Sequence, residues 1–99
     1  MLDFTDAQEM QRMYPTTFEA PTQAELDAIK KGDIVKVNHR AERFWNKVTK
    51  VNGKFITAKV DNELICEQPF KCGDKILFEK RHVYAIWTSI TEKKNSRKK

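Results

Sequence analysis

FWNKVTKVNGKFITAKV, residues 44–60, is the stretch that decides the fold. Within it, Asn52-Gly53 separates two runs rich in β-branched and aromatic residues, which is the strongest short-range signal of a β-hairpin. A two-residue type I′ turn needs positive φ at both central positions, and Asn and Gly tolerate this conformation. The sequence therefore predicts a hairpin whose turn is Asn52-Gly53.

The predicted turn also determines which side chains share a face of the hairpin. It pairs Val51 with Lys54 and Trp45 with Val60, and a period of two then places alternate residues on the same side. We expect that side to face the core, with Trp45, Lys47, Thr49 and Val51 opposite Lys54, Ile56, Ala58 and Val60. The opposite side would carry Phe44, Asn46, Val48, Lys50, Phe55, Thr57 and Lys59.

Further strands and two short helices are expected around the hairpin. Gly-Asp pairs at 32–33 and 73–74 precede the apolar runs 34–37 and 75–78, and shorter runs lie at 64–66 and 83–87. Two motifs, Thr5-x-x-Gln8 and Thr22-x-x-Glu25, match the capping box that begins a helix, so two short capped helices are predicted. These elements predict an α+β fold, with a small, strongly bent antiparallel sheet or SH3-like partial barrel and short N-terminal helices.

Composition predicts one domain with a basic β unit. The chain has 99 residues and a net charge of +5. We expect a single α+β domain over residues 1–90, made of a helical N-terminal segment (1–31) and a β unit (32–90), followed by a basic disordered tail (91–99). Acidic side chains predominate in residues 1–30, whereas basic ones predominate in residues 31–91 and 92–99.

Location and redox state follow from what the sequence lacks. No apolar run approaches the roughly 20 residues of a membrane span, and the acidic start lacks the basic and apolar regions of a signal peptide. A cytoplasmic protein that does not enter membranes is therefore expected. Cys66 and Cys72 match no Cys-x-x-Cys pattern, so we expect reduced thiols, with neither a metal site nor a cofactor.

Catalytic motifs are not evident in the sequence. It contains neither a Gly-x-Ser-x-Gly motif nor a glycine-rich phosphate loop, and His39 and His82 have no nucleophile adjacent in sequence. The sequence therefore predicts a non-catalytic protein.

The excess of basic charge favours an anionic partner such as nucleic acid, although a lysine-rich surface can also serve solubility alone. Phe44 and Phe55 could stack on bases while Lys50 and Lys59 contact phosphates, unless the N-terminal segment covers this face. We expect Trp45 and Trp87 to lie in the core. The predicted nucleic-acid contacts, through phosphates rather than base edges, are Lys36, Arg40, Arg43, Phe44, Lys47, Lys50, Phe55, Lys59, Lys80, Arg81, Arg97, Lys98 and Lys99.

Residues 10–88 resemble the YegJ-like family of small domains of unknown function. The resemblance is carried, in order, by Gly32-Asp33, Phe44-Trp45-x-x-Val48-x-x-Val51, Gly53-Lys54-Phe55, Val60-Asp61-Asn62, Gly73-Asp74-Lys75-Ile76 and Ile86-Trp87. It implies an α+β fold without a known catalytic reaction, often in stand-alone accessory or mobile-element proteins. The chain departs from the family pattern at Glu63-Leu64, where a proline is common, and at Ala85-Ile86, where an aspartate often precedes the last tryptophan.

A protein-interaction module is the alternative function. It would be an inhibitor, an accessory factor or a small structural component of a viral or other assembly. An exposed sheet edge would accept a partner strand, and residues 61–70 would form an adaptable loop. The sequence leaves the oligomeric state open.

Overall fold

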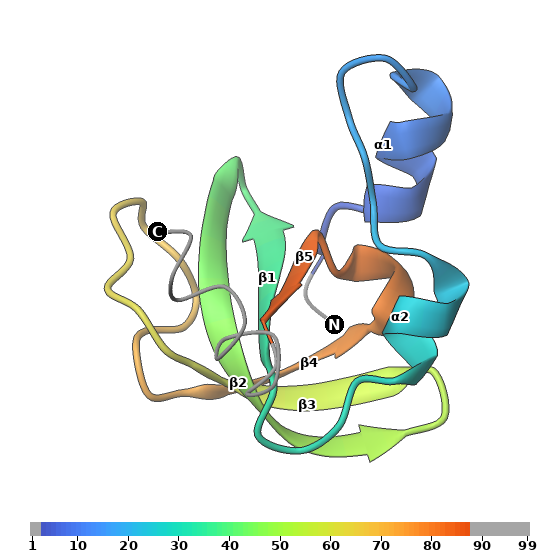
Figure 1. Cartoon of the computed structure of the whole chain (residues 1–99). Helices are drawn as coiled ribbons and strands as arrows, with labels where there is room; N and C mark the ends of the chain where they lie inside the picture. Colours follow the sequence, from blue (N-terminus) through green and yellow to red (C-terminus); the bar gives the residue numbers. More distant parts are fainter. Residues whose placement is uncertain (1–2, 88–99) are drawn as a thin grey trace, which may run out of the picture.

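The computed structural model describes residues 3–87, which form two short helices and one five-stranded antiparallel sheet (Figure 1). The elements are α1 (Ala7–Met13), α2 (Gln23–Asp27), β1 (Ile34–His39), β2 (Glu42–Asn52), β3 (Phe55–Val60), β4 (Lys75–Glu79), the 3-10 turn η1 (Lys80–His82) and β5 (Ala85–Trp87). The strand order is β4-β3-β2-β1-β5, and the sheet does not close on itself. The coarse α+β prediction is therefore confirmed, whereas the strand predicted at 64–66 is wrong.

The two helix starts differ in how well local sequence predicts them. At α2 the predicted capping box is present: Glu25 N donates to Thr22 Oγ1 (3.2 Å), and Thr22 N donates to Glu25 Oε1 (2.8 Å). At α1 the prediction is wrong, because Asp6 caps the helix by accepting a hydrogen bond from Glu9 N (3.0 Å). Thr5 instead binds β1, where its N donates to Asn38 O (3.0 Å).

The hairpin forms at the predicted place, but its turn lies one residue later. Asn52 pairs with Phe55, so Gly53 and Lys54 are the two loop residues. Gly53 has a φ of 63°, and Asn52 and Lys54 do not have positive φ. A type II′ turn needs positive φ only at its first central residue. Gly53 meets that requirement without a strained Asn52, which corrects the predicted type I′ turn.

A β-bulge reverses the predicted faces of β2. Val48 pairs with Ala58 and Lys50 with Thr57, which leaves Thr49 as the extra residue. The core-facing residues of β2 before the bulge are therefore Phe44, Asn46 and Val48, and the placement of Trp45, Lys47 and Thr49 on the core side was wrong. For β3 the predicted core residues Ile56, Ala58 and Val60 are confirmed.

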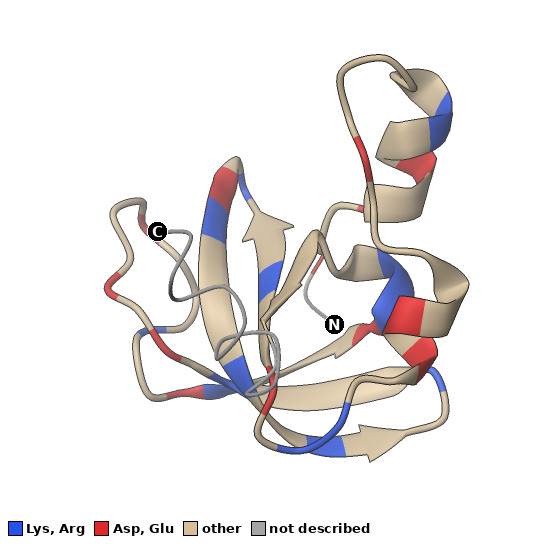
Figure 2. Ribbon diagram, viewed as in Figure 1, with Lys and Arg blue, Asp and Glu red and all other residues tan. Residues whose placement is uncertain are grey.

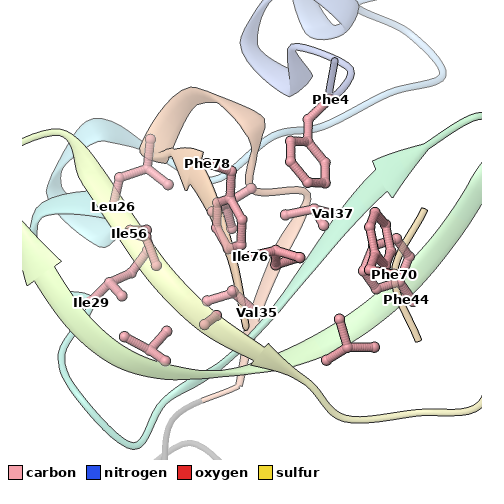
Figure 3. Packing of buried hydrophobic residues seen from close by; sticks show 14 residues of the cluster. Phe4, Leu26, Ile29, Val35, Val37, Phe44, Ile56, Phe70, Ile76 and Phe78 are labelled. Carbon is pink, nitrogen blue, oxygen red and sulfur yellow. The ribbon is translucent and has the colours of Figure 1, made fainter. Parts of the chain in front are cut away.

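The core fills the concave side of the bent sheet and is covered by the N-terminal segment (Figure 3). Phe4 of the N-terminal segment packs into this cluster, and its ring centroid lies 5.6 Å from that of Phe78 and 5.2 Å from that of His39. Leu26 of α2 and Ile29 after it are buried against the same cluster. The N-terminal segment therefore covers the face of the sheet that carries Phe44.

Glu42 fixes the long loop between β3 and β4. Its carboxylate accepts hydrogen bonds from Ile65 N (2.6 Å), Cys66 N (3.0 Å) and Gln68 Nε2 (3.2 Å). The hydrogen bond from Ile65 N is the main reason that the pKa of Glu42 lies below its ordinary value. Loop residues 65–68 are thereby held against the start of β2.

Candidate functional site

The convex side of the sheet, which we call the outer face, carries most of the unpaired basic side chains of the described residues. It consists of the residues that alternate with the buried positions of each strand. Blue segments recur on neighbouring strands in Figure 2. The residues of the outer face include Ile34, Lys36, Arg43, Trp45, Lys47, Lys50, Phe55, Thr57, Lys59, Lys75, Leu77, Glu79 and Trp87.

Three lysines stand side by side across three neighbouring strands. Lys47 of β2 is directly opposite Lys59 of β3, and Lys59 is directly opposite Lys75 of β4. All three are exposed, and within residues 3–87 none of them forms an ion pair with an acid. Adjacent strands are about 4.8 Å apart, so this lysine row spans about 10 Å. Like charges directly opposite each other destabilise a sheet, so the row carries a cost in the isolated protein.

Aromatic rings and two further cations continue the outer face toward β5. The ring centroids of Trp45 and Trp87 are 6.1 Å apart at an angle of 58°. Lys36 Nζ lies 4.9 Å from the Trp45 ring centroid, and the Arg43 guanidinium carbon lies 5.0 Å from that of Tyr84. These cation–π contacts hold both cations against the sheet surface while leaving their charge without an acidic partner in the described chain.

A shallow groove lies on the outer face near the hairpin end. It has a volume of about 330 Å³ and is lined by Lys50, Asn52, Phe55, Thr57 and Leu77. Phe55 is partly exposed here, with Lys54 Nζ 5.4 Å from its ring centroid. Lys50 and Phe55, which were predicted to act together, thus lie on the same face. They are near the hairpin turn, whereas the lysine row lies farther along the strands.

The structure brings several predicted contact residues together and separates others from them. Lys36, Arg43, Lys47, Lys50, Phe55 and Lys59 share the outer face. Phe44 is 1% exposed and packs in the core against Phe70, so it cannot stack on a base. Arg40 lies in the β1–β2 turn with a φ of 53°. Arg97, Lys98, Lys99 and the tail as a whole lie outside the described residues.

Lys80 and Arg81 of η1 form ion pairs with acids at the two helices. Lys80 Nζ lies 3.4 Å from Asp27 Oδ1. Arg81 Nη1 donates to Asp6 Oδ2 (2.7 Å), and its Nε donates to Glu79 Oε1 (2.8 Å). Because both cations already pair with acids of the same chain, their geometry does not favour the predicted role of Lys80 and Arg81 in phosphate binding.

Asp6, Glu79 and Arg81 each stabilise the charged form of their partner. The hydrogen bonds to Glu79 and then Asp6 raise the pKa of Arg81. Burial opposes ionisation of Asp6, but the hydrogen bonds from Arg81 and Glu9 N outweigh it and hold the pKa of Asp6 below its ordinary value. The Arg81 hydrogen bond is also the largest reason for the lowered pKa of Glu79. All three groups therefore stay charged at neutral pH.

Each of the two histidines forms a hydrogen bond within the fold. His39 Nδ1 is 2.7 Å from Gln68 Oε1, and His82 Nδ1 accepts a hydrogen bond from Glu79 N (3.0 Å). Burial, followed by the nearby Arg81 charge, lowers the pKa of His82. Within residues 3–87, no group of three or more His, Cys, Asp or Glu side chains could hold a metal ion. In the same range, no helix has the length and apolar composition needed to span a membrane.

Sequence reasoning missed Lys75, Trp45 and Trp87 as outer-face residues. Lys75 could have been found, because it alternates with the apolar Ile76 and Phe78 in a predicted strand. The two tryptophans were expected in the core, but both are only partly buried and lie on the outer face. Trp45 was misplaced because the bulge at Thr49 reverses the alternation of β2.

The arrangement presents cations and aromatic rings together on an open convex surface. Such a surface can contact a polyanion at several points without enclosing it. No protein-family model, curated protein or solved structure matches the chain.

Proposed function

We propose that the protein is a non-catalytic module that binds nucleic acid through the phosphate backbone. The observation that carries the proposal is the lysine row, Lys47, Lys59 and Lys75, on the exposed side of three paired strands. A polyanion lying across these strands would relieve the repulsion between the lysines and release its own counterions.

The chemistry of the outer face supports phosphate contact without base-specific readout. Lysine ammonium groups act as point charges and do not form the planar, bidentate pattern by which arginine reads guanine. Lys36 and Arg43 extend the basic surface along β1 and β2. We therefore expect affinity that depends strongly on salt and weakly on sequence.

The fold adds support of a more general kind. The strand order β4-β3-β2-β1-β5, strong bending and a 3-10 turn before the last strand support placing the domain with SH3-like partial barrels. The resemblance to the YegJ-like family remains a prediction, and we propose it on the motifs given above.

The test is a fluorescence-anisotropy titration with labelled single- and double-stranded oligonucleotides at about 50 and 200 mM salt. If only the three lysines of the row contact phosphates, raising the salt from about 50 to 200 mM should weaken binding about 20- to 40-fold. The double variant Lys47→Gln/Lys59→Gln should lower the salt slope by about 1.4 for single strands and 1.8 for duplex. The control Lys31→Gln/Lys71→Gln removes the same charge from exposed positions off the outer face and should leave the slope unchanged.

Failure to bind either oligonucleotide at low salt would reject the proposal. The protein-interaction alternative would then be favoured, with the loop between β3 and β4 and the free edge of β4 as the surfaces to test. An equal change of slope in the two double variants would mean that binding depends on net charge and not on the lysine row.

A further inference from the structure

The outer edge of β4 has backbone groups directed away from the sheet. At the two ends of its pairing with β3, Lys80 N donates to Lys54 O (2.9 Å), and Val60 N donates to Asp74 O (2.8 Å). In an antiparallel pair, every second residue directs its N–H and C=O to the partner strand. The residues between these ends that face β3 are therefore Ile76 and Phe78.

Lys75, Leu77 and Glu79 consequently direct their backbone groups to the open edge. One of these groups is used, because Glu79 N donates to His82 Nδ1. No hydrogen bond of the N–H groups of Lys75 or Leu77 to any other element is found in residues 3–87. This leaves a short run of donors and acceptors that another strand could pair with.

The side chains along this edge favour pairing. Residues 75–79 contain neither proline nor a bulge, two devices by which proteins protect an edge strand. Leu77, at the centre, is 42% exposed and lines the outer-face groove with Phe55 and Thr57. The edge is therefore apolar in its middle and charged at both ends, with Lys75 on one side and Glu79 on the other.

This pattern is complementary to itself. If a second copy pairs antiparallel with β4 and the pairing is centred on Leu77, Leu77 lies opposite Leu77 of the second copy. Lys75 then lies opposite Glu79 of the second copy, whose carboxylate also accepts the hydrogen bond from Arg81 of its own chain, and the same contact recurs by symmetry. Opposite charges on directly facing residues stabilise a sheet, whereas shifting the register by two residues removes this match.

We infer that β4 is the interface of a two-fold symmetric dimer in which the two sheets form one continuous sheet. The Leu77 N–H and C=O of each copy bond to those of the other, and each Lys75 N–H donates to the Glu79 carbonyl of the second copy. Because the two-fold axis is perpendicular to the sheet, both outer faces lie on the same side. The inference does not depend on nucleic-acid binding.

Register-specific cross-linking tests the dimer. Cys66 and Cys72 are exposed free thiols, so both are first changed to serine in the full chain. Directly opposite residues with paired backbones have Cα atoms about 5.5 Å apart, which suits a disulfide. Leu77→Cys should therefore cross-link to itself under mild oxidation. Lys75→Cys is the matched control, since the Cα atoms of its two copies would be about 14 Å apart, too far for a disulfide.

Sedimentation equilibrium of the unmodified chain provides the second measurement. The wild type should show a concentration-dependent dimer, and Lys75→Glu should weaken it at least tenfold because it places two acids opposite each other. Lys71→Glu, an equal charge change at an exposed loop position, should not weaken it. Circular dichroism confirms that each variant is folded.

Three outcomes would overturn the inference. A chain that stays monomeric up to about 1 mM, where even an association worth only about 4 kcal/mol would be visible, has no such interface. Self-cross-linking of Lys75→Cys without that of Leu77→Cys would assign another register. A dimer that Lys71→Glu and Lys75→Glu weaken equally would be held by net charge and not by β4.

Discussion

Neutralising the middle lysine of the lysine row should make the protein more stable while weakening its binding to a polyanion. Lys59 faces Lys47 on one side and Lys75 on the other, so Lys59→Gln removes two like-charge contacts at once. Each directly opposed pair of like charges costs roughly 0.2–1 kcal/mol. Since these lysines are exposed, we use the lower part of that range and expect a gain of about 0.5–1 kcal/mol at low salt.

Salt dependence separates this effect from other consequences of the substitution. The Debye length falls from about 30 Å at 0.01 M to about 3 Å at 1 M, so the repulsion should be almost fully screened at the higher concentration. Changes in strand propensity or packing would persist in high salt. The stability gain of Lys59→Gln should therefore decrease to within about 0.2 kcal/mol of zero at 1 M salt.

The assay is urea unfolding of the wild type, Lys59→Gln and the control Lys71→Gln, each at low and high salt. In the control, the lost charge comes from an exposed loop position outside the row. At low salt, a gain of 0.5–1 kcal/mol corresponds to a rise in Tm of about 2–8 °C for a domain of this size. The reasoning is refuted if Lys59→Gln is no more stable than the wild type at low salt, or if its gain is the same at both salt concentrations.

Three further predictions concern the parts of the fold that support this surface. Leu26→Ala should lower the free energy of unfolding by about 2–5 kcal/mol in urea titrations, because Leu26 is 1% exposed; a loss below 1 kcal/mol would contradict its place in the core. Glu42→Gln should increase hydrogen exchange at the Ile65 and Cys66 amides, which donate to the carboxylate, and unchanged protection would refute the anchoring role. The lowered pKa of His82 means that its contribution to stability is complete above the ordinary histidine pKa of about 6.5 and is lost as the pH falls toward its folded-state pKa. His82→Asn should flatten stability against pH in that window, and an unchanged profile would assign the acid sensitivity to other groups.

Local sequence determined the features that depend on neighbouring residues. Thr22 and Glu25 satisfy each other's backbone amides within one helical turn, so their spacing was sufficient to predict the start of α2. Strands β1 and β4 were found because each is an apolar run that follows a Gly-Asp pair, and β3 was found as the second arm of the hairpin. The hairpin itself was found from a glycine that tolerates positive φ at position 53.

The faces of β2 could only be decided by the tertiary structure. A bulge is a property of two paired strands, and nothing in the composition around Thr49 distinguishes it from the uninterrupted alternation that was assumed. That single extra residue moves Phe44 into the core and Trp45 to the outer face. The fold class was therefore predictable, while the identity of the exposed aromatic residue was not.

The candidate site likewise combines both levels. The sequence by itself determined an excess of basic charge in the β unit and predicted Lys47 and Lys59 as contacts of an anionic partner. The registers of three strands determined that these lysines and Lys75 form a row, and long-range ion pairs directed Arg81 to Asp6. Residue type fixes the charge of a side chain, but pairing between distant segments fixes which charges face one another and which are neutralised.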